Sequence, residues 1–289
     1  IEALLKEHEK TLANIAEYNE ILSNRAAMAK VIIRELEAYK KEYGRPRRTV
    51  IDNLKEAVVE EKKIEEMDVV FLMDRFGYAK TIDMAAYERN REAADAENRY
   101  VLTCKNTDKI CIFTNKGQMH LLKVLDLPFG KFRDKGTPID NLSNYNSSEE
   151  NFVYITNLGA ICNHKLIFGT KMAMLKIVDG SEFDVAKRTT AATKLTDGDE
   201  VLLVHPVAGN ETIVMQSERD FFLRIAVDSI PEKKKGAVGV RGMRLADGDA
   251  LTAIHLLGEG ESVQTEVKGK SVMLNRLHVA GRDTKGTKK

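Results

Sequence analysis

The sequence IFTNKGQMHL at residues 112–121 decides the fold. Apolar and β-branched side chains lie on both sides of a glycine, a pattern typical of two strands joined by a tight turn. It recurs as FLMDRFGYAK at 71–80, IFGTKMAM at 167–174, VMQSERDFFLR at 214–224 and VQTEVKGK at 263–270. The turns recur about every 40–55 residues, the period of four-stranded blades arranged around an axis. The sequence therefore predicts a mainly β, propeller-like array of about five blades.

A second repeated element follows three of the hairpins. Its copies are KGTPIDNL at 135–142, RTTAATKLTDGD at 188–199 and VGVRGMRLADGD at 238–249. The last two copies end in Asp-Gly-Asp and lead into apolar strands. We interpret these acidic residues as turn residues that reverse the chain. A metal site is the weaker alternative, because the carboxylates recur once per blade and do not cluster.

Residues 1–43 show the period of amphipathic helices. Leu4, Leu12 and Leu22 lie near one helical face, and a break at Asn24 is followed by a second stripe of the same kind. The simplest interpretation is an antiparallel α-helical hairpin that buries its own apolar seam. The alternative is a surface that binds a partner.

The composition excludes several classes of protein. Charged residues make up 31% and hydrophobic residues 43% of the 289, and no apolar run reaches the roughly 18 residues of a membrane span. The first residues also lack the layout of a signal peptide, so we expect a cytoplasmic protein without membrane contact. Cys104, Cys111 and Cys162 have no C-x-x-C spacing, which predicts neither a disulfide framework nor a zinc site.

Four motifs, taken in order, resemble the A subunits of bacterial DNA gyrase and topoisomerase IV. They are IIRELE at 32–37, YGRPRRTV at 43–50, the segment from DVV to GYAK at 68–80, and GVRGMRLADGD at 239–249. The resemblance covers nearly the whole chain. It implies that residues 1–48 form the end of a coiled-coil arm and a linker, and that residues 49–289 form a C-terminal DNA-binding domain. It also implies a β-pinwheel, in which neighbouring blades exchange strands.

Two features depart from the gyrase pattern. In gyrases the first blade is followed by a basic, glycine-rich box that lets the domain wrap DNA, whereas residues 87–99 here read YERNREAADAENR. The third and fourth hairpins also lack the turn glycine that the first two have at Gly77 and Gly117. A likeness to topoisomerase IV, which acts without such wrapping, is therefore favoured. A degenerate gyrase domain that wraps DNA is the alternative.

The resemblance implies that the chemistry lies elsewhere in the enzyme. Enzymes of this family cut DNA through a tyrosine, helped by an arginine and by Mg²⁺ held on the B subunit. The eight tyrosines here lie in the expected helices, strands or a loop, and we expect none of them to form an Arg-Tyr pair of the family's catalytic type. We therefore expect no catalytic residue, metal or cofactor in this segment, with ATP and Mg²⁺ used by other domains.

The partners that the resemblance implies are double-stranded DNA and the ATPase B subunit in an A2B2 holoenzyme, and the implied location is the nucleoid in the cytoplasm. The implied role is to bind and bend duplex DNA for ATP-dependent strand passage, in decatenation or supercoil control.

Basic residues at the hairpins and in the connections after them are the candidate DNA contacts. The net charge is only +1, but residues 100–289 carry 27 basic and 23 acidic side chains. Neutralising phosphates releases counterions, so such binding is tolerant of sequence and sensitive to salt. The candidates are Lys116, Lys123, Lys131, Arg133, Lys135, Lys171, Lys176, Lys187, Arg188, Arg219, Arg224, Lys233, Lys234, Lys235, Arg241, Arg244, Lys268, Lys270 and Arg276.

Two other classes of function stay open at this point. A propeller can present a surface to a partner protein, which needs an aromatic or apolar patch on its loops. It can also hold an active site in its central channel, which needs convergent titratable residues. The sequence offers basic hairpins and few aromatic residues, so it favours DNA.

Overall fold

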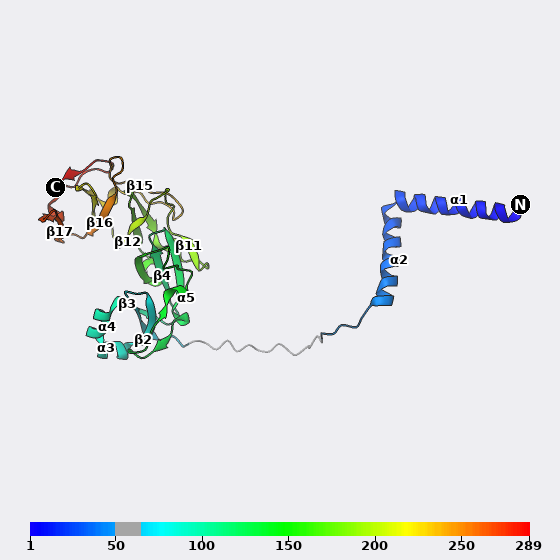
Figure 1. Cartoon of the computed structure of the whole chain (residues 1–289), viewed down its shortest axis with the longest axis horizontal. Helices are drawn as coiled ribbons and strands as arrows, with labels where there is room; N and C mark the ends of the chain where they lie inside the picture. The colour runs from blue at the N-terminus through cyan, green and yellow to red at the C-terminus, as the bar shows by residue number, and fades with distance from the viewer. Residues whose placement is uncertain (50–64) are drawn as a thin grey trace. The chain divides into compact units, whose positions relative to one another are not determined.

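The computed structural model describes residues 1–49 and 65–289, and the chain divides into two compact units, Ile1–Lys62 and Lys63–Lys289 (Figure 1). The expected domain boundary at residues 48–49 adjoins residues 50–64, which lie outside the described residues. In the described part, no helix combines the length and the apolar character needed to cross a membrane.

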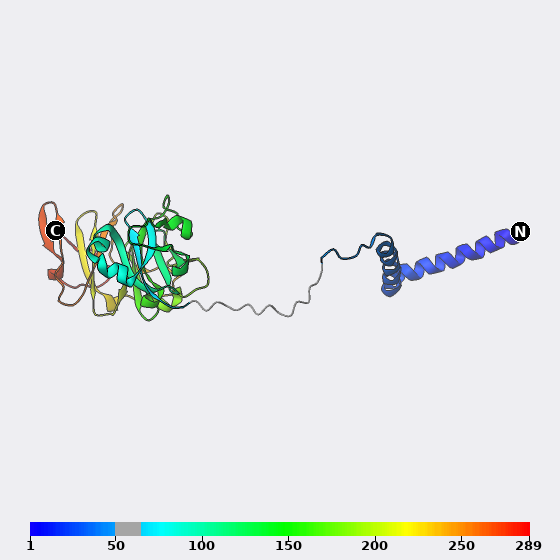
Figure 2. The same ribbon diagram turned by 90° about the horizontal axis from the view of Figure 1, so that it is seen from below.

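The first unit contains two helices, α1 (Glu2–Ser23) and α2 (Arg25–Tyr43), which diverge from the single residue between them (Figures 1 and 2). That residue, Asn24, is extended, and its side chain accepts a hydrogen bond from the backbone N–H of Ala26 at 2.9 Å as an N-cap. The helical pair is thus confirmed. Its expected buried seam is wrong, because no residue within these two helices is buried and one extended residue is too short a connection for α2 to fold back along α1.

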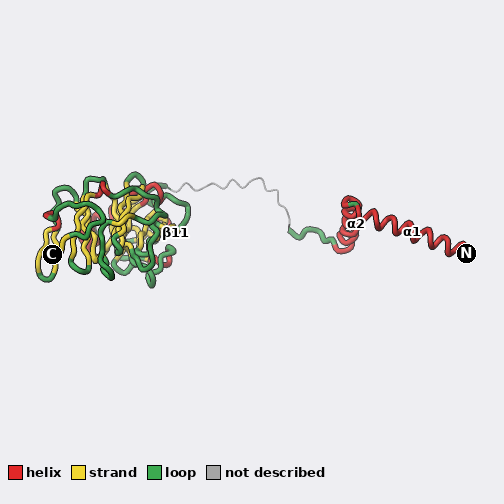
Figure 3. Tube along the Cα trace, turned by 90° about the horizontal axis from the view of Figure 1, so that it is seen from above, coloured by secondary structure: helices red, strands yellow, loops and turns green. Residues whose placement is uncertain are grey.

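Strands dominate the second unit (Figure 3), where four sheets and a hairpin follow one another in a curved row (Figure 1). The first sheet contains β3 (Asn98–Lys105), β1 (Asp68–Asp74), β2 (Tyr78–Asp83), β6 (Phe129–Gly130) and β7 (Thr137–Pro138). The second contains β8 (Phe152–Asn157), β4 (Lys109–Thr114), β5 (Gln118–Lys123) and β11 (Thr189–Ala191). The third contains β12 (Val201–Val207), β9 (Lys165–Thr170), β10 (Met174–Asp179) and β15 (Val240–Arg241). The fourth contains β16 (Leu251–Leu257), β13 (Thr212–Ser217), β14 (Phe221–Ala226) and β19 (Thr287–Lys288), and the hairpin pairs β17 (Gln264–Val267) with β18 (Lys270–Met273).

Neighbouring sheets exchange strands, which confirms the predicted β-pinwheel. After the hairpin β4–β5 of the second sheet, the chain returns to the first sheet through β6 and β7 before it adds β8 to the second. In the same way β11, β15 and β19 return to the sheet before the hairpin they follow. Each return begins with a 3-10 turn: Val124–Asp126, Gly180–Phe183, Val227–Ser229 or Leu274–Arg276. The one-turn helices α5 (Ile139–Leu142) and α6 (Leu158–Ile161) follow β7 and β8.

Three of the return strands pass so close to a hairpin that only glycine fits. Gly136 precedes β7 and Gly239 precedes β15, and a Cβ at these positions would lie 2.7 Å from the carbonyl oxygen of Ala79 and 2.6 Å from that of Leu175. Gly286, before β19, faces the backbone in the same way. The absence of a side chain is therefore what lets each return strand reach its sheet.

The core lies between successive sheets. Ile112 of β4 packs with Phe71 of the first sheet, whereas its neighbour Phe113 packs with Phe168 of the third. Because alternate side chains enter different cores, the hairpin strands are buried on both faces. They therefore read as continuous apolar runs in the sequence.

Two short helices cover the outer face of the first sheet. They are α3 (Met84–Arg89) and α4 (Arg91–Glu97), whose Tyr87 and Ala94 pack against Leu72 of β1. The acidic segment 87–99 is therefore bound to the first blade through its own small core.

The hairpin turns use a residue with positive φ. Gly77 and Gly117 have φ of 85° and 71°, and Ala173 and Asp220 take the same place with φ of 58° and 62°. The third and fourth turns keep their geometry without glycine, at a cost of about 1–2 kcal/mol for each left-handed L-residue.

We predict that Gly117→Ala destabilises the chain far more than Gly269→Ala. Both glycines have positive φ, but a Cβ at Gly117 would lie 2.9 Å from the carbonyl oxygen of Thr193, whereas nothing lies within 4 Å at Gly269. Urea unfolding should give a loss of about 1 kcal/mol for Gly269→Ala and about 3 kcal/mol for Gly117→Ala. Equal losses would show that backbone conformation alone sets the cost.

Candidate nucleic-acid interface

The predicted DNA contacts fall into three groups. One group is exposed and, within residues 1–49 and 65–289, has no carboxylate in ion-pair distance. Its members are Lys123, Lys131, Arg133, Lys135, Lys187, Arg188, Arg219, Lys270 and Arg276. Most of them lie in the connections that return from one sheet to the sheet before it. These connections therefore carry most of the predicted contacts that have no carboxylate partner in the described residues.

The first connection, between β5 and β7, presents Lys131, Arg133 and Lys135. The carboxylate of Asp134 accepts a hydrogen bond from the backbone N–H of Lys131 at 2.7 Å and so closes a tight turn. Lys131 and Arg133 line a groove of about 740 Å³ together with Arg89 of α3. The sequence-based prediction missed Arg89, because it lies in a segment that is acidic overall and only the packing of α3 brings it to this connection.

A second groove, of about 230 Å³, is lined by cations from two connections. Lys123 at the end of β5 lies there with Lys187 and Arg188, which precede β11, and with Lys109 and Asp126. Lys109 pairs with Lys123 in the hairpin register and lies 3.4 Å from a carboxylate oxygen of Asp184. The sequence-based prediction missed Lys109, although the turn at Gly117 already places residue 109 opposite residue 123.

The second group consists of exposed cations that already have an acidic partner. Lys116 lies 2.9 Å from Glu200 and Lys268 lies 2.5 Å from Asp220. The hydrogen bond from Lys116 holds the pKa of Glu200 below its usual value. Such surface pairs add little stability, but their carboxylates reduce the positive potential that a phosphate meets.

The other candidates in the later blades have a carboxylate or a backbone carbonyl group as partner, or are half-buried. Arg241 and Arg244 both approach Asp283 at 3.5 Å, and the hydrogen bond from Arg244 lowers the pKa of that carboxyl. Lys234 lies 3.4 Å from Glu182, and Lys235 donates to the backbone carbonyl of the same residue at 2.6 Å. Arg219 donates to the backbone carbonyl of Asp247 at 2.7 Å. Lys171 and Lys233 are half-buried.

The third group corrects the sequence-based prediction. Lys176 is 1% exposed, and its Nζ donates to the carbonyl oxygens of Lys235 at 2.6 Å and Ala237 at 3.0 Å, with Lys234 and Ala192 at 3.3 Å. It therefore cannot contact DNA in this fold. Its position in a hairpin strand suggested the surface, but both faces of these strands are buried.

Arg224 is a second correction. Its Nε donates to the hydroxyl of Thr212 at 2.9 Å, and its Nη1 donates to the carbonyl oxygen of Asn275 at 2.5 Å. The guanidinium is half-buried between two chain segments, so it holds the fourth sheet to the connection that leads to β19.

The Asp-Gly-Asp turns serve the fold as predicted. Asp199 is buried and accepts hydrogen bonds from the hydroxyl of Thr170 at 2.7 Å and the backbone N–H of Met172 at 2.9 Å. Gly198 beside it has φ of 77°. In the described ranges, no group of three or more His, Cys, Asp and Glu side chains is arranged to hold a metal ion.

The buried ammonium of Lys176 predicts a pH dependence of stability. Burial lowers its pKa from 10.5 to about 8. Between these values the unfolded chain binds the proton and the folded chain has lost it, so the free energy of unfolding rises with pH. Urea unfolding should give a difference between wild type and Lys176→Met that grows by about 1–3 kcal/mol from pH 8 to pH 10. A difference independent of pH would mean that Lys176 keeps its ordinary pKa.

This architecture is similar to that of known proteins. Residues 108–145, 164–208 and 211–257 match the family model described as the DNA gyrase C-terminal domain, β-propeller. The chain is 30% identical to the DNA gyrase A subunit of Lawsonia intracellularis over 303 residues, which cover 99% of this chain and 37% of that protein. It is 26% identical to the DNA gyrase A subunit of Metamycoplasma arthritidis, covering 99% and 34%. The chain thus spans about a third of the length of these curated relatives.

Solved structures share the fold. The C-terminal domain of a DNA topoisomerase IV superposes with a TM-score of 0.70 at 21% identity, covering 78% of this chain and 73% of that one. The E. coli ParC C-terminal domain gives 0.64 at 12% identity, covering 77% and 94%, and a DNA gyrase A C-terminal domain gives 0.51 at 16%, covering 76% of each. From the matched repeats, the exchanged strands and these relatives, we conclude that the chain belongs to the family of type IIA topoisomerase A subunits and contains their C-terminal β-pinwheel domain.

Proposed function

We propose that this domain binds duplex DNA along the connections between its blades and bends it without completing a wrap. The observation that carries the proposal is the distribution of charge. Six predicted contacts that have no carboxylate partner in the described residues lie at the connections after β5 and β10, and they are Lys123, Lys131, Arg133, Lys135, Lys187 and Arg188. Two grooves at these connections also include Lys109 and Arg89.

This arrangement suits a phosphate backbone and not a base sequence. Flexible lysine and arginine side chains can neutralise phosphates, and Lys131, Arg133, Lys187 and Arg188 lie outside the helices and strands, the elements that read bases in a groove. Binding is therefore tolerant of sequence and weakens steeply with salt. A curved row of such contacts would favour a bent duplex, at an elastic cost of a few kcal/mol that the phosphate contacts offset.

The segment in the place of the gyrase box supports bending without wrapping. Helices α3 and α4 are packed against the first sheet, and the hydroxyl of Tyr87 donates to the carboxylate of Asp95 at 2.9 Å. The segment carries Glu88, Glu92 and Glu97 as well. An acidic pair of helices bound in this way cannot act as a free basic strap that closes a loop of DNA. The curated relatives are gyrase A subunits, so a degenerate wrapping domain is the alternative.

The role in the whole enzyme is part of the proposal. As the C-terminal part of an A subunit, the domain would guide DNA for ATP-dependent strand passage, with a B subunit in an A2B2 assembly supplying ATP hydrolysis and Mg²⁺. Its place of action would be the nucleoid in the cytoplasm. Catalysis would belong to other segments of the enzyme.

We predict that two charge-matched double variants bind DNA differently. Lys187→Ala with Arg188→Ala removes two exposed cations without carboxylate partners among the described residues, whereas Lys116→Ala with Lys268→Ala removes two that are already paired. Titration of a labelled duplex across a salt series should lower the salt slope by about 1.8 for the first variant and by much less for the second. Equal effects would mean that net charge alone, and not these connections, attracts DNA.

A plasmid experiment separates bending from wrapping. The purified chain is bound to relaxed circular plasmid across a salt series, a nicking-closing enzyme is added, and the linking number is read on a gel. We expect salt-sensitive binding with no net change in linking number. A positive shift would support gyrase-like wrapping, and no binding at low salt would refute DNA binding in favour of a protein-interaction domain.

A further inference from the structure

One position in the first three hairpins carries a polar side chain that is buried or half-buried. It is the third residue after the turn residue with positive φ: Lys80, His120 and Lys176. In the fourth hairpin the same place holds the apolar Leu223, which packs in the core between the third and fourth sheets. A polar group at a place that otherwise belongs to the core needs hydrogen-bond partners there.

The two lysines find their partners in the connections that return from the following hairpin. Lys80 Nζ donates to the carbonyl oxygen of Phe132 and, at 2.8 Å, to that of Asp134, and it lies over the ring of Phe132 at 5.3 Å. Lys176 makes the same kind of contact, described above, with the connection that contains Lys234 and Lys235. An ammonium group has three donors and so can satisfy several carbonyl oxygens that no strand pairs.

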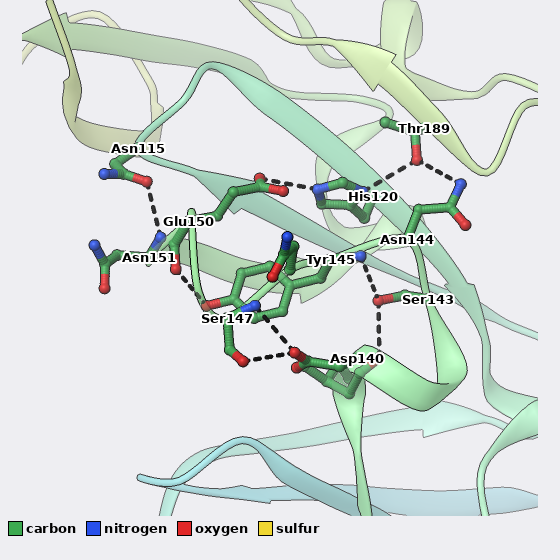
Figure 4. A network of polar contacts seen from close by, with 12 residues as sticks. Asn115, His120, Asp140, Ser143, Asn144, Tyr145, Ser147, Glu150, Asn151 and Thr189 are labelled. Atoms are coloured by element: carbon green, nitrogen blue, oxygen red, sulfur yellow. Dashed lines mark hydrogen bonds and ion pairs between the residues drawn. The ribbon is translucent and has the colours of Figure 1, made fainter.

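His120 uses its two ring nitrogens in place of an ammonium group (Figure 4). Nδ1 lies 3.1 Å from the hydroxyl of Thr189, the first residue of β11, and Nε2 lies 3.0 Å from the carboxylate of Glu150. Asn144 also donates to the hydroxyl of Thr189 at 3.0 Å. His120 therefore ties the return strand to the loop that precedes β8.

Each of these contacts falls on or beside the basic residues of a connection. The two carbonyl groups that Lys80 binds flank Arg133, and Arg188 immediately precedes Thr189. Lys234 is a third case, because its carbonyl group accepts from Lys176 while its side chain is 88% exposed. The backbone is thus held on the inside at the places where the side chains reach solvent.

We propose that Lys80, His120 and Lys176 are positioning residues that fix the basic connections in the shape that binds DNA, an inference that rests on the proposed function. The connections contain little regular secondary structure, and the two lysines bind carbonyl groups of residues that lie outside the strands. Flexible connections lose more conformational entropy when they bind a phosphate backbone, and this lowers affinity.

The test uses the full chain with three single substitutions. Lys80→Met removes the donors at a half-buried site, Lys80→Arg keeps donors there, and Leu223→Met changes the equivalent residue that makes no such contact.

Hydrogen exchange of the amides of residues 129–136 is followed by mass spectrometry, and affinity for a labelled duplex is measured in parallel. We expect Lys80→Met to speed exchange in that peptide at least tenfold and to weaken DNA binding about threefold to tenfold. Lys80→Arg should keep most of the exchange protection and most of the DNA affinity, and Leu223→Met should leave both the exchange rate and the affinity unchanged.

The outcomes distinguish this inference from the proposed function. Unchanged exchange in Lys80→Met would refute the positioning contact, and faster exchange with unaltered affinity would refute its role in binding DNA. If the wild-type chain does not bind DNA at all, the proposed function and with it the DNA role of these residues fail, while the exchange data still decide whether Lys80 holds the connection.

Discussion

The return of the chain to the preceding sheet is the constraint on which the rest of this structure depends. Each sheet takes a strand from the connection that follows the next hairpin, so no sheet is completed by one continuous run of sequence. The exchange places the hairpin strands between two cores and buries them on both faces. It also requires Gly136 and Gly239 at the close approaches, and it leaves irregular connections that need hydrogen-bond partners.

The same constraint decides what a basic residue does. Lys176, at the third place after a turn, is buried and binds a connection, whereas Lys187, in a connection itself, is exposed to solvent. Neither role follows from the residue type. In the later blades a cation such as Arg241 already has a carboxylate neighbour, whereas Lys131 and Lys187 have none among the described residues.

Much of the fold could be predicted from the sequence because the hairpin motif is local and repeated. The turn glycines, the apolar arms and the Asp-Gly-Asp turns depend on residues close in sequence, and five repeats are visible without any knowledge of long-range contacts. The candidate site was harder to predict. Lys176 and Arg224 look like surface residues until the partner strands are placed, and Arg89 gains its position from helix packing. The prediction of a buried helical seam was wrong for a related reason, because sequence periodicity shows that a helix has an apolar face but not which residues pack against it.

Because of strand exchange, one repeat of the sequence does not coincide with one sheet of the structure. A stretch of chain from one hairpin to the next supplies most of its own sheet and the last strand of the sheet before it. Deleting such a stretch during evolution would therefore remove the edge strand of the preceding sheet. Duplicating it would add a sheet that receives its edge strand from the next repeat and supplies an edge strand to the preceding sheet. Blade number in such a chain can grow by tandem duplication at the hairpin boundary, and only the terminal unit is left without a donor.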